Sequence, residues 1–236
     1  LLEAIKASTN VMCCFDNIEV IYVGLDKELD YYERDYRKKV KGRGYKSGPN
    51  EQFFELISRL SYYEDFIFYM ETDCVPLRQG WLDAIRELAE GDSESWVIGA
   101  YYRGVERISE RFTFHLNGNA LYRVGDPEFI AFVENFWRPK LYEILDSVDQ
   151  RMAYDCLLSH VFNAADPEIS NQEWKTLQTV GHRFRATSLI QNISGAADQQ
   201  QDTVDLVRRL LTRSTSTVVA HGSLFQKHAN KMLIEL

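Results

Sequence analysis

Two carboxylate residues, Glu71 and Asp73, stand one residue apart directly after an apolar run that covers residues 66–70. In an extended backbone, side chains two positions apart point to the same side, so both carboxylates could reach one hard cation. A divalent ion held there would bridge the phosphates of a nucleoside diphosphate and neutralise the charge that builds on this leaving group. The alternative interpretation is an acidic loop that caps the following helix.

Residues 66–82 resemble the acid-x-acid segment of GT-A glycosyltransferases, in which a strand ends in D-x-D or a variant of it. In that family the segment holds Mn²⁺ or Mg²⁺ together with the sugar nucleotide. This chain departs from the pattern because Glu71, one methylene longer than Asp, stands at the first position. The resemblance implies that Asp73 is a metal ligand and that Glu71 contacts either the metal or the ribose and sugar of the donor.

Residues 114–120 resemble the glycine-containing segment that lines the donor sugar and the acceptor in the same family. The resemblance implies sugar contacts from Asn117, Gly118 and Asn119. Glycine lets the backbone approach a ligand closely, and an Asn side chain offers both donors and acceptors. A strand kink or tight turn is an equal alternative, because Asn-Gly is a common turn signal. His115 by itself is more often a packed polar residue than a ligand.

Asp155 stands near the start of an expected helix, where many GT-A members carry an x-E-D motif. The resemblance implies that Asp155 is the general base for the acceptor hydroxyl in an inverting enzyme, or a sugar contact in a retaining one. Tyr154 replaces the middle acid of the family pattern. An acid in a first helical turn is also stabilised by the helix dipole without any catalytic role.

His221 follows a short expected strand over residues 217–220 and precedes Gly222. Many family members place a metal-binding His after such a strand, and a neutral imidazole can complete a mostly oxygen site for Mn²⁺. Asn50 lies in a position that resembles a nucleotide-contacting segment of GT-A proteins. Asn50 could instead cap the helix expected over residues 51–60, and we favour capping over the donor contact.

Strands and helices that must position these residues alternate along the chain. Apolar and β-branched runs predict strands over residues 18–24, 66–70, 96–102, 112–122 and 217–220, and helical spacing predicts helices over residues 1–8, 51–60, 81–91, 129–137, 154–162 and 204–211. This alternation predicts an α/β fold with a mostly parallel central sheet flanked by helices, Rossmann-like in its layers. Ligands bind beyond the carboxyl ends of the strands in such sheets.

The resemblance extends over about residues 1 to 225 and places the first strand of the family before residue 1. We therefore expect residues 1–236 to form a single GT-A-like catalytic domain that belongs to a longer chain.

Composition restricts the partners of the 236-residue chain. Its net charge of −8 argues against nucleic acid as the main partner, because phosphate backbones need a basic surface. No apolar run approaches 18 residues, so we expect no membrane span, and the four cysteines, which form no C-x-x-C pair, fit reduced thiols in a cytoplasmic protein. A local basic cluster could bind a diphosphate or form a solvated loop; it consists of Arg34, Arg37, Lys38, Lys39, Lys41, Arg43 and Lys46.

These observations predict a glycosyltransferase that uses Mn²⁺ or Mg²⁺ to move a sugar from a nucleotide-diphospho-sugar. The acceptor would contain carbohydrate: a growing polysaccharide, a lipid-linked glycan or a protein. The departures at Glu71 and Tyr154 leave open an alternative, a carbohydrate- or nucleotide-sugar-binding domain without catalysis. A nucleotidyltransferase is a third hypothesis, although it would normally need a glycine- and lysine-rich phosphate loop that this sequence does not display.

Overall fold

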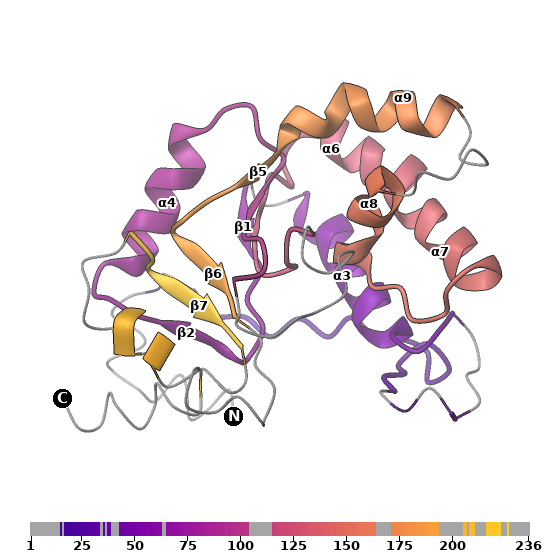
Figure 1. Ribbon diagram of the computed structural model, residues 1–236, viewed down its shortest axis with the longest axis horizontal. Helices are drawn as coiled ribbons and strands as arrows, with labels where there is room; N and C mark the ends of the chain where they lie inside the picture. The colour runs from indigo at the N-terminus through magenta and orange to yellow at the C-terminus, as the bar shows by residue number, and fades with distance from the viewer. Residues whose placement is uncertain are drawn as a thin grey trace.

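The computed structural model describes residues 15, 17–33, 35, 37–38, 43–62, 65–103, 115–163, 171–193, 205–206, 208–210, 216–222 and 226. Over these residues the chain is a mixed α/β protein. Its strands and one long helix, α4, lie on one side of the molecule, and most of the other helices lie on the opposite side (Figure 1).

The strands form two small sheets. The first has the order β1-β4-β3-β5, and its strands are β1 (Ile67–Phe68), β4 (Leu121–Tyr122), β3 (Val97–Gly99) and β5 (Phe184–Ala186). The second has the order β2-β7-β6, and its strands are β2 (Cys74–Pro76), β7 (Val219–His221) and β6 (Ile190–Asn192). A parallel bridge between Tyr102 and Asn192 connects the chain after β3 to β6, and so links the two sheets.

The sheets are mixed rather than mostly parallel. The β1–β4, β3–β4 and β2–β7 pairs are antiparallel, whereas only β3–β5 and β6–β7 are parallel. The predicted α/β class is therefore confirmed in its coarse form, and the mostly parallel pairing is not. The reason is that β4 returns between β1 and β3 in the opposite direction, which the alternation of elements along the sequence did not reveal.

The helices are α3 (Ser47–Leu60), α4 (Trp81–Gly91), α6 (Pro127–Phe132), α7 (Arg138–Ser147), α8 (Tyr154–Asn163) and α9 (Asn171–Val180), with a π-helical turn η1 (Val133–Trp137) between α6 and α7 and a 3₁₀ turn η2 (Gly181–Arg183) after α9. Asp126 begins α6 by accepting hydrogen bonds from the N–H groups of Glu128 and Phe129, and Pro127 stands at the first helical position, where it needs no partner for a backbone N–H.

An aromatic core joins the helices to the first sheet. Phe53 of α3 is fully buried and stacks on Tyr154 of α8, with their ring centroids 3.8 Å apart. The Phe53 ring also lies edge-on to Tyr122 of β4 and at a tilt to Trp137 of η1. Four elements are therefore fixed against one another directly beside the residues that the sequence singled out.

Several predicted elements are confirmed with shifted ends. The helix predicted over residues 51–60 begins at Ser47, so Asn50 lies inside α3 and does not cap it. The helix predicted over 81–91 matches α4, and the helix predicted over 154–162 matches α8. The sequence missed α7, α9, η2, β2, β5 and β6.

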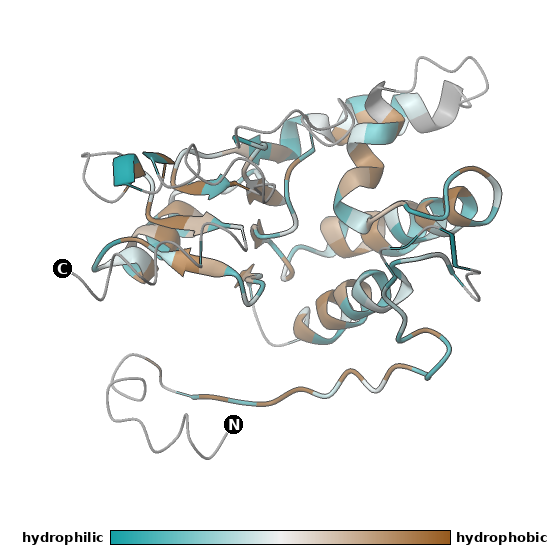
Figure 2. Ribbon diagram, turned by 60° about the horizontal axis from the view of Figure 1, so that its bottom comes forward, coloured by the Kyte–Doolittle hydropathy of each residue, from teal (hydrophilic) through white to brown (hydrophobic). Residues whose placement is uncertain are grey.

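The strand predicted over residues 18–24 is wrong. None of these residues takes part in the sheet pairings of the described chain, and Figure 2 shows the segment running along one side of the molecule, apart from both sheets. Arg59 instead donates to the carbonyl oxygens of Tyr22 and Val23 at 2.9 and 2.7 Å. The helix predicted over residues 1–8 and residues 112–114 lie outside the described residues, whereas residues 205–206 and 208–210 of the helix predicted over 204–211 are helical. No helix among the described residues is long and apolar enough to cross a membrane.

Candidate metal centre

Glu71, Asp73 and His221 form a three-residue cluster. The Nε2 atom of His221 lies 3.1 Å from Oε2 of Glu71 and 3.1 Å from Oδ1 of Asp73. One ligand atom from each of the three residues lies within 4.8 Å of the other two, a spacing that could hold one metal ion. These residues are also the two carboxylates and the imidazole that the sequence proposed around a divalent cation.

Strand pairing brings the cluster together. Glu71 and Asp73 lie in the turn between β1 and β2, and His221 is the last residue of β7. Antiparallel pairing of β2 with β7 sets Cys74 opposite His221, and the Gly222 N–H donates to the Asp73 carbonyl at 3.3 Å. The register between these two strands therefore fixes the imidazole beside both acids.

His221 carries a proton at neutral pH in the metal-free protein. Burial lowers its pKa, but the hydrogen bonds to Asp73 and Glu71 outweigh burial and raise the pKa to about 9. On the other side of the ring, Nδ1 lies 3.0 Å from Oδ1 of Asn192 and donates to it. Asn192 thus orients the ring so that Nε2 faces the two carboxylates, as partners behind metal-binding histidines commonly do.

Asn119 stands behind Glu71. Its Oδ1 atom accepts from the Glu71 N–H at 2.6 Å, and its Nδ2 donates to Oε2 of Glu71 at 3.2 Å. Asn119 is 1% exposed, and Nδ2 also donates to Oδ1 of Asn117 at 2.7 Å. The structure therefore places Asn119 where it positions Glu71, while Asn117 lies at the surface of a cleft.

That cleft has a volume of about 760 Å³, within the range of roughly 300–1,000 Å³ usual for small-molecule sites. The sequence-predicted residues on its walls are Asn50, Glu71, Asp73, Asn117 and Asp155. Lys46 and the exposed Tyr32 line it as well. Residues from four separated segments therefore converge on one polar cleft that borders the three-residue cluster.

Asp155 is held as an anion in this cleft. Its Oδ2 atom accepts from the Gly118 N–H at 3.2 Å and lies 3.4 Å from Nε2 of the buried His115. Burial raises the pKa of Asp155, but the charge and hydrogen bond of His115, together with the charge of Lys46, hold the pKa well below its usual range. An ionised carboxylate at this position can accept a hydrogen bond from a bound hydroxyl.

Asn50 holds the start of α8. It is fully buried, its Nδ2 donates to the Met152 carbonyl at 3.2 Å, and its Oδ1 accepts from the Tyr154 N–H at 2.9 Å. The expected capping of the helix from residue 51 is therefore corrected: the amide satisfies the first N–H of a different helix. In doing so it fixes the residue next to Asp155.

Gly118 is required by its neighbour Tyr154. A Cβ atom added at Gly118 would overlap Oη of Tyr154 and lie 2.7 Å from its Cζ atom. The ring of Tyr154 fills the core against Phe53 and covers Gly118. Tyr154 therefore has a packing role beside Asp155.

Sequence reasoning underrated several residues of the site. His115 contacts Asp155, and only its position before Asn117 and Gly118 could have indicated this. The basic cluster divides in two, because Arg37, Lys38 and Arg43 pair with Asp35, Glu33 and Glu51, whereas Lys46 lines the cleft. Arg34, Lys39 and Lys41 lie outside the described residues.

Cys74 lies next to the cluster but is not suited to bind the metal. Burial raises the pKa of its thiol to about 12, and Sγ donates to Oδ1 of Asn119 at 3.0 Å. The thiol is therefore already engaged with Asn119, and the group whose ligand atoms lie close enough to share one ion consists of Glu71, Asp73 and His221. The ligands available from this cluster are therefore two carboxylates and one imidazole.

No protein-family model matches the chain, and no curated protein or solved structure matches it either. A function for the chain therefore has to be proposed from its own residues and their geometry. The resemblance to GT-A glycosyltransferases stays a prediction.

Proposed function

We propose that the chain is a metal-dependent glycosyltransferase of the GT-A type that takes its sugar from a nucleotide-diphospho-sugar. The observation that carries the proposal is the cluster of Glu71, Asp73 and His221 at the border of a polar cleft. The same cleft is lined by Asn117 and Asp155, which the sequence assigned to the sugar and to the acceptor hydroxyl.

The ligand set fits a hard or borderline divalent ion. Carboxylate oxygens suit Mg²⁺ and Mn²⁺, and the imidazole of His221 favours Mn²⁺ between these two. Asp73 and His221 would hold the ion, with Glu71 as a further ligand or a contact to the donor. When bound, the ion supplies positive charge against the diphosphate leaving group. Lys46 adds a second positive charge to the cleft wall.

Asp155 orients the acceptor hydroxyl. Because the pKa of Asp155 lies below its usual range, the carboxylate is an anion at neutral pH and a weak general base. It accepts a hydrogen bond from the hydroxyl at first, and takes the proton late, when the forming bond has made the oxygen acidic. The Gly118 N–H and His115 fix the direction in which the carboxylate points.

A second candidate is a nucleotide-sugar-binding domain without turnover. The low pKa of Asp155 favours it, because a carboxylate of such low basicity contributes little proton transfer. The two candidates share the metal centre and the donor cleft, and only the fate of the donor separates them. Release of free sugar or a glycosylated product supports the transferase, whereas saturable donor binding without either product supports the binding domain.

Calorimetric titration of UDP, GDP and their sugar conjugates with and without Mn²⁺ tests the shared part of both candidates. We expect at least one nucleotide to bind only with Mn²⁺. We also expect Asp73→Ala to weaken that binding at least about 100-fold, because loss of a metal ligand should exceed the loss usual for a residue that only hydrogen-bonds to a ligand. Asp83→Ala is the matched control, because Asp83 is an exposed acid on α4 that pairs with Arg86. Equal binding with and without Mn²⁺ for every nucleotide would overturn the proposal.

A further inference from the structure

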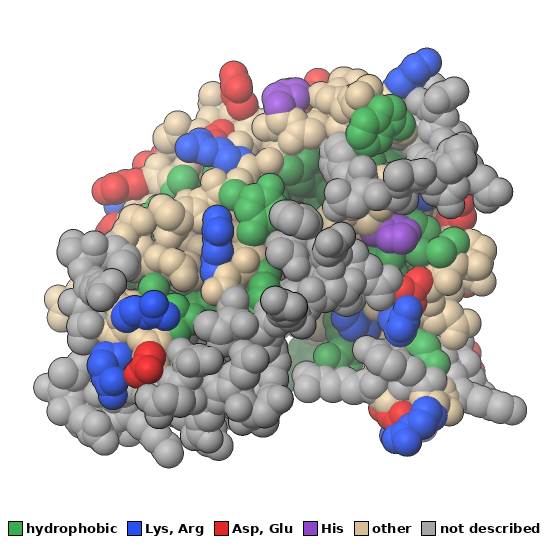
Figure 3. Space-filling model, in the orientation of Figure 1, with side chains coloured by type: hydrophobic (Ala, Val, Ile, Leu, Met, Phe, Trp, Pro, Cys, Tyr) green, Lys and Arg blue, Asp and Glu red, His purple; other side chains and the backbone are tan. Residues whose placement is uncertain are grey.

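A second cavity lies behind Asp155. It has a volume of about 310 Å³, near the lower end for small-molecule sites. Its walls are mainly apolar and aromatic, and they include Tyr101, Leu116, Trp137, Leu158 and Phe184. Hydrophobic side chains are visible in the hollowed middle of the molecular face in Figure 3. The wall composition differs sharply from the polar cleft beside the metal centre.

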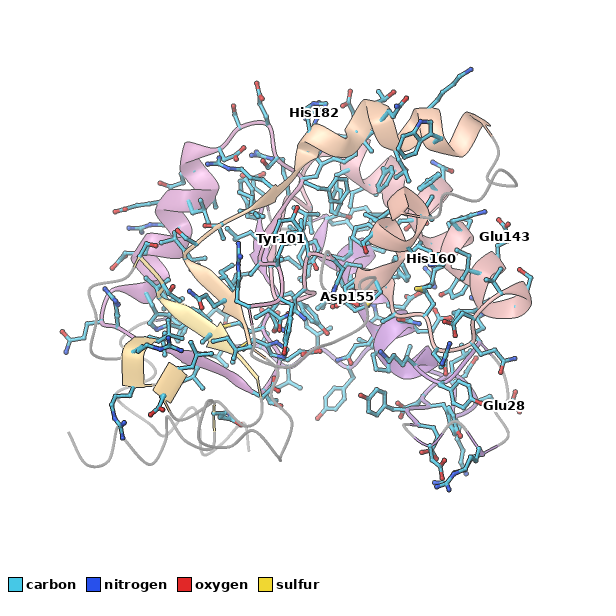
Figure 4. All side chains as sticks on the ribbon, in the orientation of Figure 1. Glu28, Tyr101, Glu143, Asp155, His160 and His182 are labelled. Carbon is cyan, nitrogen blue, oxygen red and sulfur yellow. The ribbon has the colours of Figure 1, made fainter. Side chains whose placement is uncertain are left out.

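Asp155 belongs to the walls of both spaces. Figure 4 places Asp155 and Tyr101 near the middle of the molecule, between the strands and the helical side. A ligand in the apolar cavity could therefore reach the carboxylate from one side while a donor in the cleft reaches it from the other. This arrangement is what a transfer between two bound molecules requires.

The charge around Asp155 selects the group that would face it. His115 lies 3.4 Å away and the positive charge of Lys46 also acts on the carboxylate, so its negative charge is already compensated. A further cation, such as an amine, would be repelled by these two groups. A neutral hydroxyl can instead donate a hydrogen bond to the carboxylate without adding charge.

The apolar walls select the rest of the ligand. A sugar ring carries hydroxyl groups on most of its carbons, and burying them against Leu116, Trp137 and Leu158 without partners would be costly. An aromatic or short aliphatic body would bury apolar surface there at a gain of about 25 cal/mol per Å². The other polar groups among the described lining residues are the hydroxyls of Ser159, Tyr101 and Tyr122 and the indole N–H of Trp137. Of these, the Tyr122 hydroxyl and the Trp137 N–H already donate to backbone carbonyls.

We propose that this cavity binds the acceptor, and that the acceptor, in place of the carbohydrate expected from the sequence, is an alcohol with a small apolar or aromatic body whose hydroxyl contacts Asp155. The role as acceptor rests on the proposed transferase function, whereas binding of the alcohol does not. In the transfer, the alcohol oxygen bonds to the anomeric carbon while the bond from that carbon to the diphosphate oxygen breaks. The diphosphate leaves with the electron pair, and the hydroxyl proton passes to Asp155 and then to water.

Saturation-transfer NMR with 2-phenylethanol on the full chain, without donor or metal, tests the binding directly. We expect saturable binding with the strongest transfer at the phenyl ring, and no comparable binding of maltose. Ser159→Leu, which fills part of the cavity, should weaken binding at least about tenfold, because the added side chain competes for the same space. Val148→Leu is the control, since Val148 is 68% exposed beyond the end of α7 and should leave binding unchanged.

A second variant protects the test against misfolding. If Ser159→Leu lowers the melting temperature strongly, Tyr101→Ala replaces it, because Tyr101 is 38% exposed and its loss should weaken binding several-fold without unfolding the core. Absence of 2-phenylethanol binding up to its solubility limit would overturn the inference. So would unchanged binding in a folded Ser159→Leu variant, or tighter binding of maltose than of the alcohol.

Parallel titrations of UDP and GDP with Mn²⁺ separate this inference from the proposed function. If nucleotides bind with Mn²⁺ but the alcohol does not bind, only the assignment of the acceptor site is overturned. If the alcohol binds but no nucleotide does, the proposed transferase function is overturned and the cavity remains a site for an apolar ligand. If both bind, the alcohol should become glycosylated in the presence of the correct donor, and Asp155→Asn should reduce that product while retaining nucleotide binding.

Discussion

Two histidine–carboxylate clusters lie along the same cleft, and they are built for different tasks. In the first, His221 faces both Glu71 and Asp73, and those acids are partly exposed. In the second, the buried His115 lies 3.4 Å from Asp155, whose side chain is 16% exposed and accepts a backbone N–H. The same residue types therefore give two carboxylates around one imidazole in the first place and a single carboxylate held by a histidine and a peptide N–H in the second.

Electrostatics accounts for the difference. Two acids around one imidazole raise the pKa of His221 to about 9, so the imidazole is protonated at neutral pH. A metal ion that binds there would have to displace this proton. One acid between His115, Lys46 and a peptide N–H is already compensated, so the pKa of Asp155 falls and the carboxylate gains little from a further cation. Number and placement of charges decide the chemistry more than residue identity does.

Removing each histidine in turn should separate the clusters most clearly. His221→Ala is expected to weaken Mn²⁺ binding at least about 100-fold. Removing a metal ligand should cost more affinity than the roughly 10–100-fold usual for removing a residue that hydrogen-bonds to a ligand. His115→Ala should change Mn²⁺ affinity less than about threefold. Isothermal titration of Mn²⁺ into both variants measures this, and a larger loss in His115→Ala would assign the metal to the Asp155 cluster.

Breaking the packing behind Asp155 should destabilise the protein through the contact between Gly118 and Tyr154. Gly118→Ala forces a methyl group against the ring of Tyr154, and we expect a loss of about 1–3 kcal/mol in unfolding free energy from overpacking. Adding Tyr154→Phe removes the overlapping hydroxyl and should recover part of this loss. Gly91→Ala, with nothing within 4 Å of the added atom, is the control that should be neutral or slightly stabilising. Urea unfolding curves provide the measurement.

The first cluster was largely predictable from sequence, whereas only Asp155 of the second was. Glu71 and Asp73 follow an apolar strand, and His221 follows a β-branched run, so local pattern was enough to nominate them. Their contact depends on the pairing of β2 with β7, which joins distant parts of the chain and has no local signal. For His115 the one signal was its position before Asn117 and Gly118, since its contact depends on where α8 places Asp155.

The sequence located the polar residues of the site correctly, but it did not predict which groups their side chains bind. Asn50 and Asn119 were assigned to the donor or to a cap, yet their amides bind the start of α8 and the backbone of Glu71. An Asn can serve either purpose, and only its partners decide. The strand expected over residues 18–24 is wrong for a related reason: β-branched residues favour an extended chain, but a strand needs a neighbour with free backbone groups.

The raised pKa of His221 predicts a pH effect confined to the first cluster. The folded state binds this proton more tightly than the unfolded chain, whose His has a pKa of about 6.5. The resulting stability is fully present below pH 6.5 and is lost as the pH rises to about 9. After allowance for the exposure of Glu71, we expect roughly 2 kcal/mol.

Urea unfolding in metal-free buffer at pH 6 and pH 9.5 checks this effect as a difference between the wild type and His221→Gln. Subtracting the variant removes the contribution of the other groups that titrate in this range. A variant that loses as much stability as the wild type over the same interval would show that the two carboxylates do not hold the proton of His221.

The smallest expected effect concerns Asn192, which touches no proposed ligand atom of the metal. Its Oδ1 accepts from Nδ1 of His221 at 3.0 Å, so it fixes which nitrogen faces Glu71 and Asp73. Asn192→Ala should weaken Mn²⁺ binding about tenfold, at the lower end for such partners, and Asn192→Asp should retain or strengthen it because the acceptor is kept. If Asn192→Ala binds Mn²⁺ as the wild type does, the imidazole is held by its strand alone, and the orientation of His221 needs no partner behind the ring.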